Sequence, residues 1–145
     1  MAMEISVENL SGSAPLTVMQ LAGELDASNY QDVIARVQEL YQQGTRRLLL
    51  DLSGVTFLSS AGLVALHSAA LILRGQQPLD PESGWGAFHA ISNDLDAGTE
   101  PEANFKLLSP QPRVARALEM SGFSRLLPIF DDRDSALASF MGAAG

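Results

Sequence analysis

Hydrophobic and polar residues follow two different periods along this chain, and the period changes from segment to segment. Residues Glu4–Glu8 alternate polar and apolar, which predicts a strand at the edge of a sheet. Leu16–Ala22 predicts a second strand, which Gly23–Asp26 ends. The apolar block Arg46–Leu50 is too short for a helix and leads into Asp-Leu-Ser-Gly, so it predicts a strand buried on both faces. The leucines expected to be buried inside the sheet are Leu48, Leu49, Leu50 and Leu52.

Helical periods separate and follow these strands. A helix is predicted over about 27–43, with Asp26 or Ser28 as its cap and Gly44 at its end. A second helix is predicted over 63–73, where helix formers run without a breaker, and Ser59 or Ser60 can cap its first N–H groups. The inner face of the first helix recurs at spacings of three and four, at Tyr30, Val33, Ile34, Val37, Leu40 and Tyr41.

The last third of the chain repeats the alternation of strand and helix. Phe105–Leu108 predicts a short strand, and Ser109 is expected to cap a helix with proline in its first turn. A Ser-Gly-Phe turn at 121–123 ends that helix, and a short strand and a last helix follow. The order ββαβα, βαβα predicts an α/β domain: a mixed, mostly parallel sheet of about five strands, flanked by about four helices. The inner positions expected in the two helices are Val114, Leu118, Ala136, Leu137 and Phe140.

The segment at about 78–104 fits neither period. It contains three prolines and six Asp or Glu residues, and it has no Lys or Arg. We interpret it as an acidic loop insertion within a single domain spanning 1–145, and we expect it to add little to the core. Trp85 and Phe88 could instead anchor it on a partner or on the domain itself.

Composition and charge narrow the classes of function. The chain has 145 residues, 46% of them hydrophobic, which is enough for one domain with a sizeable core. The absence of cysteine excludes disulfides and zinc–thiolate sites. A formal net charge of −8 argues against nucleic acid or an anionic membrane surface as the partner. No apolar run is long enough to span a bilayer, so we expect a cytoplasmic protein without membrane insertion.

The segment Phe57-Leu58-Ser59-Ser60-Ala61-Gly62-Leu63 resembles the signature of the STAS domain, in particular that of bacterial anti-sigma factor antagonists. Those proteins typically read aromatic–aliphatic–Asp–Ser–Ser/Thr–Gly–Leu, and a partner kinase phosphorylates the serine after the Asp. Ser60 falls on that serine, whereas Ser59 stands where many members carry Asp. The remaining positions compare as follows: Gly62 and Leu63 match, and Ala61 replaces Ser or Thr.

Two further segments are similar to the same family. Gly23–Asp26 followed by a helix matches a turn that lies near the phosphoserine loop in these proteins. The string from Leu108 to Phe130, with its Ser-Gly-Phe turn, matches the helix and short strand near the end of many STAS domains. The resemblance therefore covers nearly all of the chain except the insertion.

The resemblance implies a binding switch that is not an enzyme and needs no cofactor or metal. The unphosphorylated chain would dock on an anti-sigma factor that is also a serine protein kinase, and phosphate on Ser60 would block docking. A serine phosphatase would reverse the switch. Ser59 is the second choice for the phosphoacceptor. The implied partner-binding residues are Asp26, Ser59, Ser60, Gly62 and Leu63.

Other interpretations of the same residues stay open. Ser60 could be a plain capping serine, and the chain could be a STAS adaptor subunit of a transporter or lipid-transport complex, which Ser59 in place of Asp favours. Asp51 could lie near the site or could bond its own turn. A Ser-His-Asp hydrolase has little support, because Gly-x-Ser-x-Gly is absent and His67 lies roughly 10 Å along the same helix from Ser60.

Overall fold

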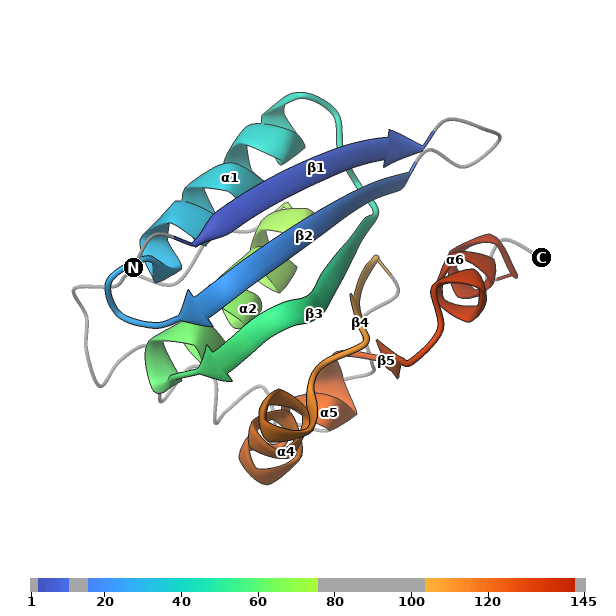
Figure 1. Ribbon diagram of the computed structural model, residues 1–145. Coiled ribbons are helices and arrows are strands. Elements are labelled where there is room, and N and C mark those ends of the chain that lie inside the picture. Colours follow the sequence, from blue (N-terminus) through green and yellow to red (C-terminus); the bar gives the residue numbers. More distant parts are fainter. Residues whose placement is uncertain (1–2, 11–15, 76–103, 143–145) are drawn as a thin grey trace.

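One mixed sheet of five strands, in the order β1-β2-β3-β4-β5, runs through the structure (Figure 1). The computed structural model describes residues 3–10, 16–75 and 104–142. The pair β1–β2 is antiparallel, and the pairs β2–β3, β3–β4 and β4–β5 are parallel. This topology confirms the predicted mixed, mostly parallel sheet. The strands are β1 (Glu4–Leu10), β2 (Leu16–Leu25), β3 (Leu48–Leu58), β4 (Phe105–Leu108) and β5 (Ile129–Phe130).

Helices pack on both faces of the sheet. Helices α1 and α2 lie behind the sheet in Figure 1, and their inner residues share the large core with those of α4 and α5. Helix α6 packs on the opposite face, where Ala136 and Phe140 meet Val18 and Leu49. Since Met19 and Leu50 belong to the large core, neighbouring residues of each strand point to opposite faces. The described helices are α1 (Tyr30–Gln42), α2 (Ser60–Leu73), α4 (Pro112–Ser121), α5 (Phe123–Leu126) and α6 (Arg133–Gly142).

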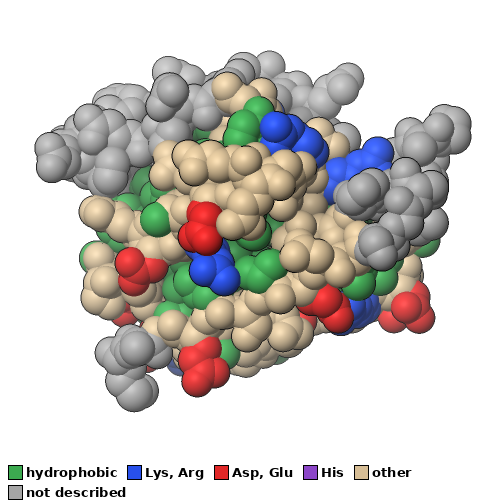
Figure 2. All heavy atoms as spheres, turned by 90° about the horizontal axis from the view of Figure 1, so that it is seen from above, with side chains coloured by type: hydrophobic (Ala, Val, Ile, Leu, Met, Phe, Trp, Pro, Cys, Tyr) green, Lys and Arg blue, Asp and Glu red, His purple; other side chains and the backbone are tan. Residues whose placement is uncertain are grey.

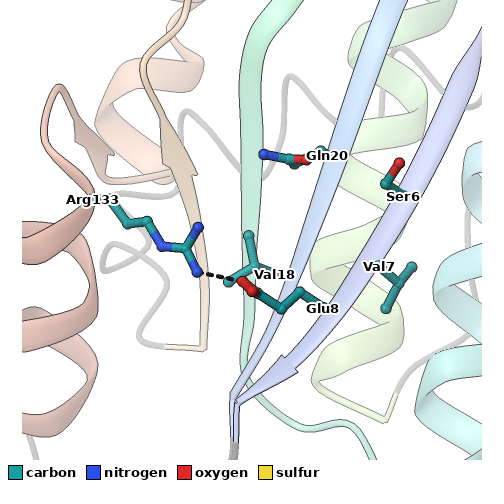
Figure 3. A pocket seen from close by; sticks show the side chains of 6 residues that line it. All are labelled: Ser6, Val7, Glu8, Val18, Gln20 and Arg133. Atoms are coloured by element: carbon teal, nitrogen blue, oxygen red, sulfur yellow. Dashed lines mark hydrogen bonds and ion pairs between the residues drawn. The ribbon is translucent and has the colours of Figure 1, made fainter.

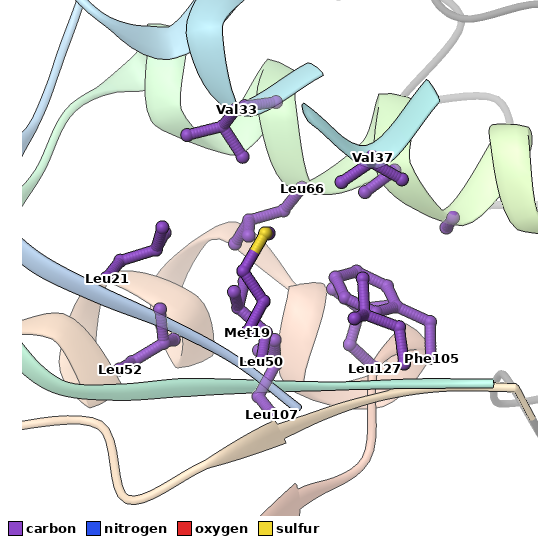
Figure 4. Packing of buried hydrophobic residues seen from close by; sticks show 14 of the residues in the cluster. Met19, Leu21, Val33, Val37, Leu50, Leu52, Leu66, Phe105, Leu107 and Leu127 are labelled. Atoms are coloured by element: carbon purple, nitrogen blue, oxygen red, sulfur yellow. The ribbon is translucent and has the colours of Figure 1, made fainter. Parts of the chain in front are cut away.

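Strand β3 lies inside the sheet between β2 and β4, as predicted. All four leucines expected to be buried there are 0% exposed, and Figure 4 shows Leu50 and Leu52 in the large core. The strand does not end after Leu52 but continues to Leu58. Its pairing with β2 shifts register twice beyond Asp51, and two less buried residues separate each buried residue from the next. The buried residues in this half are Leu52, Val55 and Leu58.

The turn between β2 and α1 differs from the prediction. Strand β2 does not end at Gly23 but runs on to Leu25, and Gly23 takes a φ of +117° at the second register shift. Neither Asp26 nor Ser28 is the N-cap of α1; the N-cap residue is Asn29. At the other end of α1 the C-cap is Gln43 and not the predicted Gly44, which is the next residue: it has a φ of +110° and donates its N–H to the carbonyl of Tyr41.

The C-terminal helices confirm the predicted inner residues but correct one cap. Val114 and Leu118 of α4 and Ala136 and Phe140 of α6 are buried, and Leu137 is half-buried. Ser109 is not the cap of α4: it has a φ of +51°, and its hydroxyl donates to the carbonyl of Asp131. Gln111 is the N-cap instead, and Pro112 opens the helix. The predicted insertion at 78–104 lies outside the described residues except for Asn104.

Candidate functional site

The start of α2 separates the roles of the two serines. Ser59 is the N-cap: its backbone is extended, and its hydroxyl oxygen accepts a hydrogen bond of 3.3 Å from the N–H of Gly62. Ser60 is the first helical residue and is exposed. The part of the chain that the structure describes gives the Ser60 hydroxyl no hydrogen-bond partner. The hydroxyl is therefore accessible at the positive end of a helix dipole.

A backbone hydrogen bond joins this serine loop to the end of β2. The N–H of Ser59 donates to the carbonyl oxygen of Leu25 over 3.0 Å. The residues that follow these two are Ser60 and Asp26, so the two loops lie side by side at the carboxyl edge of the sheet. The structure thus brings together the serine and the acidic turn that the sequence predicted as one site.

Gly62 is what allows α2 to approach the strands so closely. A Cβ atom on Gly62 would lie 2.5 Å from a Leu58 methyl carbon and 3.0 Å from the Leu25 carbonyl oxygen. Gly62 is buried, and Leu63 is half-buried against the large core. Gly62 is one of the five predicted binding residues, but it offers a partner little surface. Its role is to let the helix pack closely on the strands.

The carboxylate of Asp26 is held in one orientation by its own turn. One carboxylate oxygen accepts from the N–H of Ser28 at 2.9 Å and from the Ser28 hydroxyl at 2.5 Å. These hydrogen bonds, the side-chain one first, hold the pKa of Asp26 below its usual range, so this group is ionised at neutral pH. The site therefore presents a fixed negative charge beside an uncharged serine.

Two residues of this site were missed by sequence reasoning. Asn29 is 6% exposed, and its side chain bonds the backbone of the turn on both sides of Leu25. The only signal was an amide residue three positions after Asp26. Phe57 is 39% exposed and pairs in register with Glu24, which places an aromatic ring at the border of the site. The serine motif showed an aromatic residue at this position. Its exposure could not be predicted, because it depends on the register shifts in the second half of β3.

The other candidate residues do not join the site. Asp51 is buried at 8% exposure, and its carboxylate accepts from the N–H of Ser53 and from the side chain of Gln20. Of the two alternatives for Asp51, a place near the site or a bond to its own turn, the structure shows the second: Asp51 bonds its own segment in the middle of β3. His67 is 1% exposed within α2, with its ring edge-on to Phe123 at 6.2 Å between centroids. The structure brings neither side chain to Ser60.

The described residues contain neither a candidate metal site nor a candidate membrane-spanning helix. In the ranges 3–10, 16–75 and 104–142, no three His, Asp or Glu side chains are grouped so that they could hold a metal ion. Within the same ranges, no helix has the length and apolar character that a membrane crossing requires.

A hollow on the α6 face lies apart from the serine loop. It measures about 150 Å³, and Figure 3 shows an ion pair between Glu8 of β1 and Arg133 of α6 across it. This pair ties the start of the last helix to the edge strand. Seen from above (Figure 2), the described surface mixes acidic and basic side chains with small hydrophobic areas, and shows no broad basic patch of the kind that nucleic acid binds. The hollow is lined by Ser6, Val7, Glu8, Val18, Gln20 and Arg133.

Known proteins are similar to this chain in sequence or in fold. A family model described as Mlab, STAS domain matches residues 10–79. BtrV of Bordetella bronchiseptica, assigned by name as an anti-sigma factor antagonist, is 23% identical over 141 residues, which are 97% of either chain. The crystal structure of an anti-sigma factor antagonist from Mycobacterium paratuberculosis superposes with a TM-score of 0.66 at 18% identity, covering 97% of this chain and 95% of that one.

The anti-sigma factor antagonist SpoIIAA is similar in both of its forms. Its unphosphorylated structure gives a TM-score of 0.58 at 16% identity, over 94% of this chain and 97% of that one. The phosphorylated form from Bacillus gives 0.51 at 14% identity, over 92% and 97%. At these identities the likeness concerns the fold. The chain therefore has the fold of the anti-sigma factor antagonists, and its residues 10–79 are similar to the STAS domain that the family model describes.

Proposed function

We propose that this chain is an anti-sigma factor antagonist that is switched by phosphorylation of Ser60. The proposal rests on the different roles of the two serines at the start of α2. Ser59 caps the helix, and the Ser60 hydroxyl is exposed and has no hydrogen-bond partner among the described residues. A phosphate there would meet the positive end of the helix dipole and unbonded N–H groups of the first turn. The fold can therefore accept the group without unfolding.

The reaction belongs to the partner, which binds the ATP. The Ser60 oxygen attacks the γ-phosphorus, the new O–P bond forms as the bond to the ADP oxygen breaks, and a base of the kinase takes the hydroxyl proton. The phosphate adds about −1.5 to −2 of charge beside the ionised Asp26 carboxylate. The docking face then carries two anions where it carried one. A partner surface built for the unphosphorylated face loses affinity through repulsion and desolvation.

The partner is an anti-sigma factor that is also a serine protein kinase, and a serine phosphatase would return the chain to its docking form. The docking face comprises the exposed parts of the site and is bordered by Phe57. Since sigma factors act where transcription takes place, this function places the chain in the cytoplasm. The predicted contact residues are Asp26, Ser59, Ser60 and Leu63, with Gly62 seating the helix.

The test combines phosphopeptide mass spectrometry with titration calorimetry. After incubation with an anti-sigma factor kinase and ATP, phosphate is expected on Ser60 in the wild type and in Ser59→Ala. Ser60→Ala should stay folded, resist phosphorylation and bind constitutively. Ser60→Asp should bind more weakly, because a carboxylate brings part of the phosphate's charge. Phosphate on Ser59 alone would show that Ser59, and not Ser60, is the phosphoacceptor.

A second candidate function is a STAS adaptor subunit of a transporter or lipid-transport complex, in which neither serine is phosphorylated. Ser59 in place of the family's usual Asp favours it. Under this alternative the same experiment gives no phosphate on either serine, and Ser60→Asp binds as the wild type does.

A further inference from the structure

Asparagine is a common N-cap residue, and Asn29 occupies the N-cap position of α1. Yet its side chain makes no capping hydrogen bond to that helix. It is 6% exposed and points back into the turn after β2. A buried side-chain amide that does not bond the helix must find its hydrogen-bond partners elsewhere. The position of those partners indicates the role of the residue.

Both polar atoms of the Asn29 side chain bond the turn that carries Asp26. Its Nδ2 donates to the carbonyl oxygen of Glu24 at 2.7 Å, and its Oδ1 accepts from the N–H of Asp26 at 3.0 Å. Only one orientation of the amide satisfies both bonds, since the flipped amide would face oxygen with oxygen. The side chain therefore clamps the backbone on both sides of Leu25.

Leu25, the residue inside the clamp, is the one that holds the serine loop. Its carbonyl oxygen accepts the N–H of Ser59, and that residue in turn caps the helix that starts at Ser60. A continuous path of hydrogen bonds and one peptide segment thus runs from Asn29 to the proposed phosphoacceptor. At the buried start of this path the Asn29 amide has two defined partners, which fixes its own geometry.

We infer that Asn29 is a positioning residue for the docking face: it sets where the Asp26 carboxylate stands relative to Ser60. The expected effect of Asn29 on docking rests on the proposed function. Its effect on the position of the Asp26 turn concerns the free protein alone. Loss of the amide should loosen the Asp26 turn and, through Leu25, the loop of Ser59. Docking should weaken although Asn29 itself lies beneath the surface.

The experiment compares Asn29→Ala with Leu137→Ala, a control that removes a half-buried side chain from α6 on the other face of the sheet. Amide hydrogen exchange is followed at Ser59 and, as the internal reference, at Leu50 in the core of the same sample. In Asn29→Ala, exchange at Ser59 relative to Leu50 should rise about tenfold, and in Leu137→Ala this ratio should stay unchanged. An unchanged ratio in Asn29→Ala would overturn the inference.

Asn29→Asp covers the case in which the alanine variant is poorly folded. The aspartate keeps the side-chain length and an acceptor for the Asp26 N–H, but it sets a carboxylate oxygen against the carbonyl oxygen of Glu24, so exchange at Ser59 relative to Leu50 should rise in this variant too. Calorimetry then uses the anti-sigma factor that binds the wild-type chain, for which Asn29→Ala should lose about tenfold in affinity and Leu137→Ala should lose none. If the wild type binds and Asn29→Ala binds equally well, the inference fails and the proposed function stands. If the Ser59 ratio rises while no anti-sigma factor binds the wild type, the proposed function fails and the positioning stands.

Discussion

The N–H of Ser59 lies 3.0 Å from the carbonyl oxygen of Leu25 and donates a hydrogen bond to it. This contact continues the pairing of Leu25 with Leu58 and holds the acidic turn beside the serine loop, although helix α1 and the whole of β3 separate them along the chain. It joins the end of β2 directly to the residue that caps α2. A change on either side should be felt on the other.

Gly62→Ala is expected to destabilise the fold by about 1–3 kcal/mol, because the added methyl would meet the Leu25 carbonyl at 3.0 Å and a Leu58 methyl at 2.5 Å. Elsewhere in a helix the same substitution stabilises by up to about 1 kcal/mol. Urea unfolding measures the difference. Ser60→Ala places a methyl in the same first turn without a clash and should stay within about 0.5 kcal/mol of the wild type. A stable Gly62→Ala variant would mean that α2 can retreat from the strands.

Ser59→Ala should cost about 1 kcal/mol of stability, since it removes the oxygen that accepts the Gly62 N–H. Ser59→Asp keeps an acceptor there and adds a charge that the helix dipole favours, so it should be at least as stable as the wild type. Chemical unfolding at low and at high salt tests both variants, because screening should reduce the advantage of the aspartate. An unchanged stability of Ser59→Ala would show that the cap contributes nothing.

Lys106 offers a test by pH. It is 6% exposed under α6, donates to the Ser139 hydroxyl at 2.9 Å and lies 4.5 Å from the centre of the Phe140 ring. Burial, with the nearby Arg47 charge, lowers the pKa of Lys106. Between the folded and the unfolded pKa the unfolded chain binds more protons, so this group makes stability rise with pH across that alkaline window.

Lys106→Met should remove this alkaline rise and leave the stability at pH 7 within about 1 kcal/mol of the wild type, because an apolar chain of similar length replaces a buried charge. Lys106→Ala should be less stable than either, since it also loses the packing of the stem. Thermal unfolding at pH 7 and at alkaline pH measures both effects. The same alkaline slope in wild type and Lys106→Met would assign the slope to another group.

The acidic segment at 78–104 is predicted to contribute little to the core, and we propose that it is an insertion in a single domain. Replacing it with a short glycine linker should leave a cooperatively unfolding protein, because Leu73 and Phe105 on either side of it are both packed in the large core. Calorimetric unfolding of the shortened chain checks this. Loss of a cooperative transition would make the segment structural.

The sequence predicted the strands and helices wherever a period was long and regular. The alternation of Glu4–Glu8, the helical face of α1 and the apolar block of β3 each gave the right element in the right layer. The second half of β3 escaped prediction because its buried residues recur every three positions, at Leu52, Val55 and Leu58. That spacing is unlike a regular strand and arises from two shifts of register, which depend on the partner strand.

Capping residues were the least predictable part of the fold. Asp26, Ser28 and Ser109 have the right chemistry for caps, yet the helices begin later, at Tyr30 and Pro112. Asp26 instead bonds Ser28 within the turn, and Ser109 adopts a left-handed backbone that its bond to Asp131 supports. Several polar side chains near a turn compete for the same N–H groups, and the winner depends on contacts from distant parts of the chain. The serine motif was predictable because its elements are adjacent in sequence, whereas the buried role of Asn29 needed the folded turn.

The placement of α6 determines how this protein can be attached to other molecules. In Figure 1 the end of α6 lies at the right of the molecule, whereas the strands β2 and β3 point their carboxyl ends, and with them the serine loop, to the lower left. A reporter or surface linker fused after the last helix would therefore extend from the end opposite the proposed docking face. Chains immobilised in this way would present the serine loop outward in a uniform orientation, open to the kinase and the phosphatase that we propose as partners.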